Sequence, residues 1–488
     1  MTADDTTIGT ATRPLDGALA RIAAAPDGPG VAAMFDFDGT IVHGYSGVHF
    51  FRDRLTAGKV GPRELLGTAV NGLRGTDSEA EFERFVAVAF RAWAGHTEDE
   101  LQQVGRGVFE NTLAGLIYPE AWRLIEAHKR KGHTLVIASS ASRYQFEAAA
   151  EALGVDHLLF TPLEVADGVL TGKVDGASLW RSGKARAARA FAAAHGIDTA
   201  ASFTYSNGGE DVEFLTTMGH PTAVNPDKNL TRAADEHGWP VLRFRPRGAY
   251  NVKDLARTAA SLGTLAGSVG AGVGLGLLNL DRRLGIDAVS AIAPETMLAT
   301  AGVRVDIRGE DNAWKTRPAV FIFNHQSFLD TVLIARVLRE GFTGVTKKEM
   351  ATNPLFGPPL RIAGATFVDR RNTDKAKEAL RPVVDTLRSG TSLVVSPEGT
   401  RSLTPSIGRF KKGAFHIAIQ AGVPVVPIVI RNAGELMAKG AKLVRSGTVD
   451  IAVLPPIDVA DWDPADLQPH IDVVESLYRD TLNDWPRG

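Results

Sequence analysis

Short apolar runs and longer helical patterns alternate along two stretches of the chain. In the first stretch the apolar runs are VAAMFDFD, TLVIAS, SFTYSN, PTAVN and VLRF, all between residues 31 and 244. In the second stretch they are VRVDI, AVFIFN, FTGVT, ATFVD, SLVVS, PVVPIVI and VDIAVL, from residue 303 onward. Strands that are separated by helical segments are typical of a parallel sheet with helices on both faces. The pattern therefore predicts two α/β domains.

Three segments of different character lie outside these patterns. Residues 1–30 predict a mobile tail with one short helix. Residues 44–115 contain no clear strand and predict a helical cap inserted after the first strand. Residues 246–300 form an apolar, helical connector, so the predicted domains are 31–245 and 301–488.

The connector contains an uncharged run of 23 residues between Arg257 and Asp281. This length is sufficient for a bilayer span, which needs about 20 residues. Glycines four apart, such as Gly263 and Gly267, favour close helix packing in lipid, although glycine also lowers helix propensity. A flexible linker, a buried helix and a helix embedded in or lying on a membrane all remain open.

Composition narrows the class of protein. The chain has 488 residues, and a prior of roughly 150 residues per domain suggests about three units. The 54 basic and 56 acidic residues are balanced, so no nucleic-acid partner is expected. The absence of cysteine excludes disulfides, thiolate catalysis and cysteine metal sites. The N-terminal sequence lacks the apolar core of a secretory signal, so an intracellular protein is expected.

Two aspartates, Asp36 and Asp38, end the first apolar run in MFDFDGT. Buried carboxylates are unfavourable unless a cation offsets them, so the pair predicts a metal site, although an acidic turn alone would give the same pattern. Ligands in open α/β sheets bind at the carboxyl ends of the strands. Other polar residues at such ends are Ser139 and Ser140, Lys184, Asn207, Glu210 and Asp211.

These motifs, in this order, resemble the haloacid dehalogenase superfamily of phosphatases, and GHPTAVNPDKNL resembles its phosphoserine-phosphatase-like branch. The resemblance implies a Rossmann-like core with a helical cap. It implies that Asp36 is the nucleophile that forms an aspartyl-phosphate and that Asp38 is the acid/base. It also implies that Ser139 and Lys184 hold the phosphoryl group. The implied Mg²⁺ ligands are Asp36, the carbonyl of Asp38, Asn207 and Asp211.

The acidic loop of this chain departs from the family, in which it usually begins with aspartate. Asn207 can ligate a cation through its carbonyl but supplies no charge, and Glu210 is an extra carboxylate. Phosphoryl transfer depends on positioning and charge neutralisation, and a hard cation prefers oxygen ligands. We therefore expect a phosphatase that needs high Mg²⁺. The alternative is a catalytically weak binding or scaffolding domain.

A second polar cluster, NHQSFLD, follows the apolar run that ends at Phe323. His325 and Asp330 are five residues apart, which is about 140° apart on a straight helix. They can meet only if His325 lies in the turn and Asp330 in the first helical turn. A histidine that a carboxylate orients is a general base, and direct attack by a substrate hydroxyl is the simplest chemistry. The alternative is a strand-end histidine beside a helix N-terminal charge.

Three further blocks, GATFVDRR, SLVVSPEGTRS and VPVVPIVIRN, follow NHQSFLD. Together the four resemble the glycerolipid acyltransferases, in particular the 1-acylglycerol-3-phosphate acyltransferases, over residues 302–460. The resemblance implies that His325 deprotonates the acceptor hydroxyl, which attacks an acyl thioester, and that Asp330 orients His325. It assigns the acceptor's phosphate to Arg370 and Arg401, and the shape of the acceptor site to Glu398 and Gly399. Positive charge on a binding or solvated face is added by Lys347, Lys348, Lys411 and Lys412.

The sequence therefore predicts a 1-acylglycerol-3-phosphate O-acyltransferase that gives phosphatidic acid and is fused to a Mg²⁺-dependent phosphomonoesterase. Its expected substrates are a lysophospholipid and an acyl thioester of CoA or of an acyl carrier protein. The expected location is the cytoplasmic face of a membrane, either peripheral or shallowly embedded. Whether the chain forms a homo-oligomer stays open.

Overall fold

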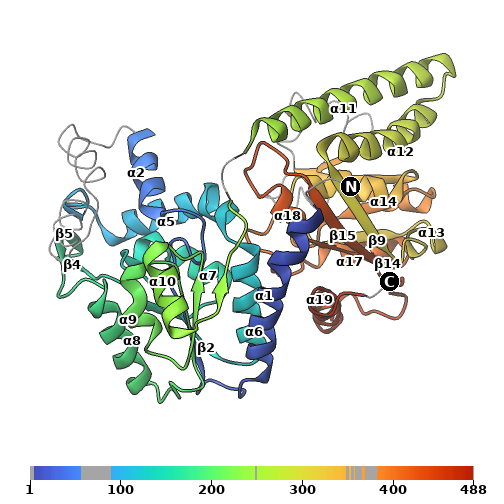
Figure 1. The fold of residues 1–488 in the computed structure, drawn as a ribbon. Coiled ribbons are helices and arrows are strands. Elements are labelled where there is room, and N and C mark those ends of the chain that lie inside the picture. Colours follow the sequence, from blue (N-terminus) through green and yellow to red (C-terminus); the bar gives the residue numbers. More distant parts are fainter. Residues whose placement is uncertain are drawn as a thin grey trace. The chain divides into compact units, whose positions relative to one another are not determined.

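The computed structural model describes residues 5–56, 90–247, 250–347, 351–352, 357, 365–368 and 382–486. The chain divides into two compact units, Met1–Ala249 and Tyr250–Gly488. Each unit contains its own sheet with flanking helices (Figure 1). The predicted class, two α/β domains joined through an apolar helical segment, is confirmed.

The sheet of the first unit has six strands in the order β3-β2-β1-β6-β7-β8. Its strands are β1 (Ala32–Phe35), β2 (Thr134–Ala138), β3 (His157–Leu159), β6 (Phe203–Ser206), β7 (His220–Val224) and β8 (Val241–Leu242). All of its pairings are parallel, so the carboxyl ends of all six strands lie along one edge. β1 lies between β2 and β6, where the strand order reverses, and such a switch point is the usual ligand site of an open sheet. The five predicted strands are present, and the short β3 is an addition.

Helices cover this sheet and extend it at the N-terminus. They are α1 (Asp5–Ala24), α6 (Pro119–Arg130), α7 (Glu147–Leu153), α8 (Ser182–Ala194), α9 (Val212–Leu215) and α10 (Lys228–His237). The segment predicted to be a mobile tail with one short helix contains the long helix α1. Leu15, Ala18 and Ile22 are buried, because their spacing of three and four places them on one face of the helix.

The segment predicted as a cap is helical where the structure describes it, in α2 (Ser46–Thr56) and α5 (Glu98–Asn111). A capping box between Thr97 and Glu100 begins α5. An antiparallel pair that the sequence pattern did not predict, β4 (Leu163–Ala166) and β5 (Val169–Val174), packs Leu170 against Leu101 of α5.

The second unit contains a seven-stranded sheet in the order β12-β11-β13-β10-β14-β15-β9. Its strands are β9 (Val303–Arg308), β10 (Val320–Phe323), β11 (Phe342–Lys347), β12 (Thr366–Val368), β13 (Ser392–Val395), β14 (Val425–Arg431) and β15 (Gly447–Val453). Its remaining helices are α13 (Asn312–Lys315), α14 (Leu329–Leu338), α17 (Gly413–Ala421), α18 (Ala433–Leu436) and α19 (Gln468–Asn483). Every pairing is parallel except that of β14 with β15. All seven predicted strands are present.

The central strand β10 is buried on both faces of this sheet. Phe321 and Phe323 point into one hydrophobic cluster, and Val320 and Ile322 point into the other. Because successive side chains of a strand face opposite ways, a strand with two buried faces appears as an unbroken apolar run. The polar residues that follow β10 therefore emerge from the middle of the core.

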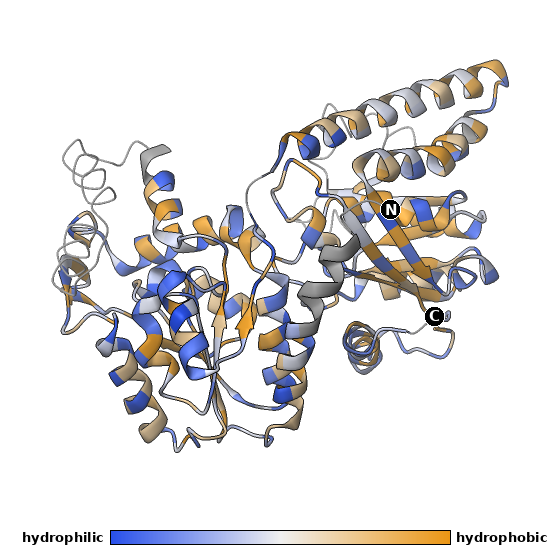
Figure 2. Ribbon diagram, viewed as in Figure 1, coloured by the Kyte–Doolittle hydropathy of each residue, from blue (hydrophilic) through white to orange (hydrophobic). Residues whose placement is uncertain are grey.

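The apolar connector is a helical hairpin of α11 (Val252–Leu278) and α12 (Arg282–Ala301). The two helices approach closely at glycines, since a Cβ atom added to Gly272 would lie 2.1 Å from Cγ2 of Val289. Among the described residues, α11 alone is long and apolar enough to cross a membrane. Its large apolar side chains are exposed, among them Val252, Leu255, Leu277 and Leu278. The ribbon of Figure 2 shows hydrophobic residues at intervals along the helix. This segment is therefore helical and mostly exposed in the structure.

Candidate active sites

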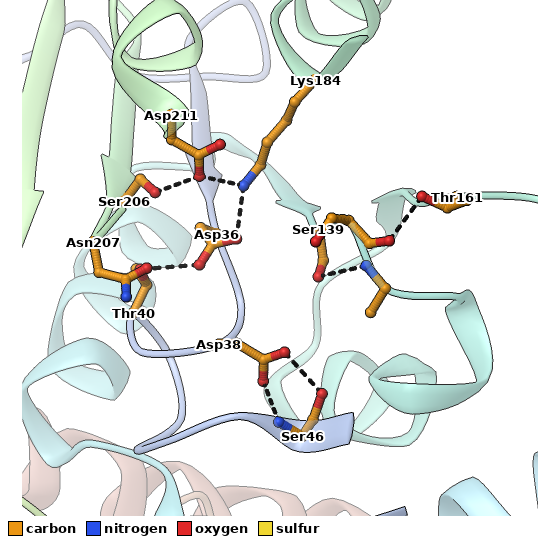
Figure 3. Close-up of polar contacts among 12 residues, drawn as sticks. Asp36, Asp38, Thr40, Ser46, Ser139, Thr161, Lys184, Ser206, Asn207 and Asp211 are labelled. Carbon is orange, nitrogen blue, oxygen red and sulfur yellow. Dashed lines mark hydrogen bonds and ion pairs between the residues drawn. The ribbon is translucent and has the colours of Figure 1, made fainter. Parts of the chain in front are cut away.

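Asp36, directly after β1, lies in a buried ionic cluster of the first unit (Figure 3). Lys184 from the first turn of α8 donates from Nζ to Asp36 Oδ1 at 2.7 Å and to Asp211 Oδ2 at 2.5 Å. Ser206 donates to the same oxygen of Asp211 at 2.6 Å. The sequence predicted the three charged residues, and the structure brings them into direct contact. Ser206 was missed.

The cluster contains more negative than positive charge. Burial raises the pKa of Asp36 to about 6, with Lys184 opposing the rise and Asp211 adding to it. Burial also raises the pKa of Asp38 to about 7 and that of Glu210 above its usual value. Burial would lower the pKa of Lys184, but Asp211 and Asp36 raise it, so this lysine stays charged. The carboxylates of Asp36, Asp38 and Asp211 around one ammonium leave a deficit of positive charge.

Asp38 is held by the start of the cap. Its carboxylate accepts hydrogen bonds from the backbone N–H of Ser46 at 2.7 Å and from the Ser46 hydroxyl at 2.9 Å. Ser46 is the first residue of α2. The candidate acid/base is therefore joined to the first cap helix, a contact that no local sequence pattern indicated.

The oxygen atoms of this site fit a hard cation. Asp36 Oδ2 and the carbonyl oxygen of Asp38 both face the side-chain amide of Asn207, and such oxygens are the ligands that Mg²⁺ prefers. No group of three or more His, Asp or Glu side chains in the described part of the chain forms a metal cluster. The four predicted Mg²⁺ ligands do not form such a group, because only Asp36 and Asp211 contribute acidic side chains. The other two ligands are the backbone carbonyl of Asp38 and the side-chain amide of Asn207.

Ser139 follows β2, the neighbour of β1, and is buried. Its Oγ accepts a hydrogen bond from the backbone N–H of Ala141 at 3.2 Å. This bond fixes the hydroxyl in the loop after β2, on the same side of the sheet as Asp36 (Figure 3).

In the second unit, His325 and Asp330 are hydrogen-bonded to each other. The Nδ1 atom of His325 lies 2.8 Å from Asp330 Oδ2. His325 lies in the loop after β10, and Asp330 lies in the first turn of α14, the one arrangement in which a spacing of five allows contact. Asp330 is completely buried, and its Oδ2 also accepts from the backbone N–H groups of Gln326 and Ser327. A proton on Nδ1 directed at this carboxylate leaves Nε2 of His325 as the basic nitrogen.

Glu398 holds the backbone of His325. Its Oε1 accepts from the His325 N–H at 2.7 Å, and its Oε2 accepts from the Ser402 hydroxyl at 2.7 Å and the Gly408 N–H at 2.6 Å. The Ser402 N–H donates to the carbonyl of His325 at 2.8 Å. Both sides of the His325 backbone are thus fixed by the segment that begins at Glu398.

The sequence assigned Glu398 to the shape of the acceptor site, a prediction that stays untested, and the structure adds a contact with the backbone of His325. The residue is 5% exposed, and donors of the protein itself occupy both carboxylate oxygens. Burial raises the pKa of Glu398, and the hydrogen bonds from His325, Gly408 and Ser402 oppose that rise. The structure indicates a residue that positions His325.

The other predicted residues of this site have different placements. Gly399 has a φ of +76°, which favours glycine, and a Cβ atom there would lie 2.9 Å from Nζ of Lys411. Arg401 is half-buried in the same loop, and Lys411 and Lys412 are exposed before α17. Two predicted residues, Arg370 and Lys348, and the side chain of Lys347 lie outside the described residues.

Known proteins match both units. A family model described as haloacid dehalogenase-like hydrolase matches residues 33–216, and a family model described as acyltransferase matches residues 304–431. The human 1-acyl-sn-glycerol-3-phosphate acyltransferase alpha is 36% identical over 192 residues, covering 38% of this chain and 68% of the human protein. The coconut 1-acyl-sn-glycerol-3-phosphate acyltransferase is 32% identical over 174 residues, covering 36% of this chain and 56% of its own.

A third relative is the inhibition of morphological differentiation protein of Streptomyces azureus. It is 33% identical over 220 residues, covering 44% of this chain and 79% of its own. The chain thus spans between 56% and 79% of the length of these three relatives.

Two solved structures are more distant. The 1-acyl-sn-glycerophosphate acyltransferase from Thermotoga maritima has 22% identity and a TM-score of 0.41, covering 49% of this chain and 99% of its own. A phosphoserine phosphatase in its apo form has 18% identity and a TM-score of 0.33, covering 42% of this chain and 91% of its own.

The hydrogen bonds around Glu398 give a kinetic prediction. We expect Glu398→Ala to lower kcat for acyl transfer by at least about 10-fold, because a hydrogen bond to a charged group contributes about 1.5–3 kcal/mol. The KM for the acceptor should change little. Ser402→Ala removes one of three donors and should lower kcat less. Steady-state kinetics would contradict the positioning role if KM rose and kcat stayed unchanged.

Proposed function

This chain belongs to the 1-acyl-sn-glycerol-3-phosphate acyltransferases through its second unit and to the haloacid dehalogenase-like hydrolases through its first, and we propose that both units are catalytically active. The second unit transfers an acyl group from a thioester to the free hydroxyl of 1-acylglycerol-3-phosphate, which gives phosphatidic acid. The observation that carries this proposal is the contact between His325 and the buried Asp330.

In the acyl transfer, Nε2 of His325 takes the proton of the acceptor hydroxyl while the hydroxyl oxygen attacks the thioester carbonyl. Asp330 keeps the proton on Nδ1 and stabilises the imidazolium that forms. The carbon–sulfur bond then breaks, and the imidazolium returns the proton to the leaving thiolate. The thiol belongs to CoA or to an acyl carrier protein. Arg401, together with Arg370, holds the acceptor's phosphate, for which a guanidinium group is well shaped.

The first unit hydrolyses a phosphate monoester in two steps. Asp36 attacks phosphorus and forms an aspartyl-phosphate, while Asp38 gives its proton to the leaving oxygen. Asp38 then takes a proton from water, which attacks the phosphoryl group and releases phosphate. Lys184 neutralises charge at the nucleophile, which it contacts directly, and Ser139 holds the phosphoryl oxygens. Mg²⁺ held by Asp36, the Asp38 carbonyl, Asn207 and Asp211 would neutralise further charge.

The alternative is that only acyl transfer occurs and that the first unit is a catalytically weak binding or scaffolding domain. Asn207 favours this alternative, since its neutral amide stands where the family usually has a carboxylate. The contact of Lys184 with both Asp36 and Asp211 favours an active site.

The protein lies on the cytoplasmic face of a membrane, peripheral or shallowly embedded, and the hairpin of α11 and α12 supports the membrane contact but not the choice of face. At its tip, Leu277, Leu278 and Leu280 are 71%, 85% and 95% exposed. Toward the other end of α11, Lys253 and Arg257 are exposed. Apolar side chains would enter the acyl region while basic ones meet anionic head groups.

Two substitutions separate the two reactions. We expect His325→Ala to lower acyl transfer by about 10²- to 10⁴-fold, because the general base is lost, and to leave phosphate release unchanged. Asp36→Asn, which removes the nucleophile, should have the reverse effect. Each variant is the control for the other in assays of free thiol and of inorganic phosphate. Near-normal acyl transfer by His325→Ala would refute the role of His325 as the general base.

The proposed phosphate contact of Arg401 predicts selectivity. Arg401→Ala should lower kcat/KM with lysophosphatidic acid by about 10- to 100-fold, because a charged hydrogen bond is lost. Activity with monoacylglycerol, a neutral acceptor, should fall much less. An equal loss with both acceptors would mean that Arg401 has a structural role or contacts the donor.

The membrane proposal predicts that the tip leucines mediate binding. Replacement of Leu277, Leu278 and Leu280 by serine should weaken flotation of the full chain with anionic liposomes, since burial of one leucine contributes about 1.5–3 kcal/mol. Replacement of the exposed Val473 and Leu477 of α19 by serine is the matched control. Unchanged flotation of the tip variant would exclude insertion of the hairpin tip.

A further inference from the structure

The side chain of Asn207 faces two oxygen atoms of the nucleophile loop. One terminal atom of its amide lies 3.2 Å from Asp36 Oδ2 and 3.0 Å from the carbonyl oxygen of Asp38. Both of these oxygens are acceptors, so we assign the amide atom between them as the nitrogen, which can donate one N–H to each. The hydroxyl oxygen of Thr40 also lies 3.3 Å from this amide atom. Thr40 donates to the same Asp36 oxygen at 3.3 Å.

The same two oxygens are candidate ligands of a divalent cation. The other oxygen of Asp36 is already bonded to Lys184. The partly positive NH₂ group of Asn207 therefore stands where the charge of a cation would act. An aspartate at this position would place its carboxylate against two acceptors with only the Thr40 hydroxyl as a nearby donor, an arrangement that repels unless a cation is bound.

We propose that Asn207 is an exchangeable element of the phosphatase site: its amide nitrogen holds the metal-free site together, and its amide oxygen faces the ion when Mg²⁺ binds. The change is a rotation of about 180° about the Cβ–Cγ bond, a torsion that is soft in asparagine. Binding of Mg²⁺ must therefore replace two hydrogen bonds. This inference rests on the proposed Mg²⁺-dependent phosphatase and adds the reason why its metal affinity is low.

The packing around Asn207 permits this exchange without repacking. Gly39 has a φ of +78° and lies against the amide, since a Cβ atom there would lie 2.2 Å from the second terminal atom of Asn207. The amide of Asn207 thus packs directly against the backbone of Gly39, which has no side chain. The nitrogen and oxygen of an amide are nearly equal in size, so they can change places within the plane of the amide.

The test compares Asn207→Asp with Asn229→Asp, a matched control that adds the same charge at an exposed position of α10. In EDTA, Asn207→Asp should melt several degrees below the unaltered protein. The control Asn229→Asp should melt at the same temperature as the unaltered protein. In calorimetric titrations Asn207→Asp should bind Mg²⁺ at least about 10-fold more tightly, because a full charge is added beside a hard cation.

The amide itself can be observed in the unaltered ¹⁵N-labelled protein, so the test does not depend on folding of the variant. Asn207→Ser, which lacks the amide, identifies its side-chain NH₂ signals. The chemical shifts of these signals should change on titration with Mg²⁺. The Mg²⁺ concentration at half of this change should agree with the Kd from calorimetry.

Two results would overturn the exchange: equal melting in EDTA with equal Mg²⁺ affinity for Asn207→Asp and the unaltered protein, or Mg²⁺ binding without a shift of the Asn207 signals. Failure of the proposed phosphatase function would give a different result. If Mg²⁺ moves the Asn207 signals but no phosphomonoester is hydrolysed, the exchange stands and the proposed hydrolysis is wrong.

Discussion

A carboxylate buried at the carboxyl end of a central parallel strand must be satisfied by hydrogen-bond donors or by positive charge, and both sites of this protein depend on how that is done. In the first unit Asp36 follows β1, and Lys184 and Thr40 are its partners. In the second unit Asp330 and Glu398 lie around the end of β10 and accept three hydrogen bonds each. An unpaired buried carboxylate would be strongly unfavourable, so these donors determine how the loops after the strands fold.

The two sites solve this problem differently. Donors of the second unit come from the protein itself, and they fix both the ring and the backbone of His325. A base that is oriented before the substrate binds needs little reorganisation during the reaction. In the first unit the carboxylates exceed the single ammonium of Lys184, and burial, with a smaller contribution from neighbouring carboxylates, raises the pKa values of Asp36 and Asp38. We therefore expect acyl transfer to be independent of a metal and phosphate release to depend on one.

Strands and motif order were predictable from the sequence because both are local. Strands that are buried on both faces appear as continuous apolar runs, and every one of those in the second unit was found. The β4–β5 pair was missed and α1 was predicted too short, since short half-exposed strands and a helix with a narrow apolar stripe give weak patterns. The positioning role of Glu398 could not be predicted, because its partners lie up to 73 residues away. The donor role that we propose for Asn207 could not be predicted for the same reason, since the oxygens that it faces follow β1.

The most direct test of this contrast is one Mg²⁺ titration of the unaltered protein in which both reactions are measured. Thiol release from an acyl thioester and phosphate release from a phosphomonoester would be followed in separate assays, beginning in EDTA. The account predicts a constant rate of acyl transfer and a rate of phosphate release that rises from near zero to a plateau. Full phosphate release in EDTA, or acyl transfer that rises in parallel with it, would contradict the account.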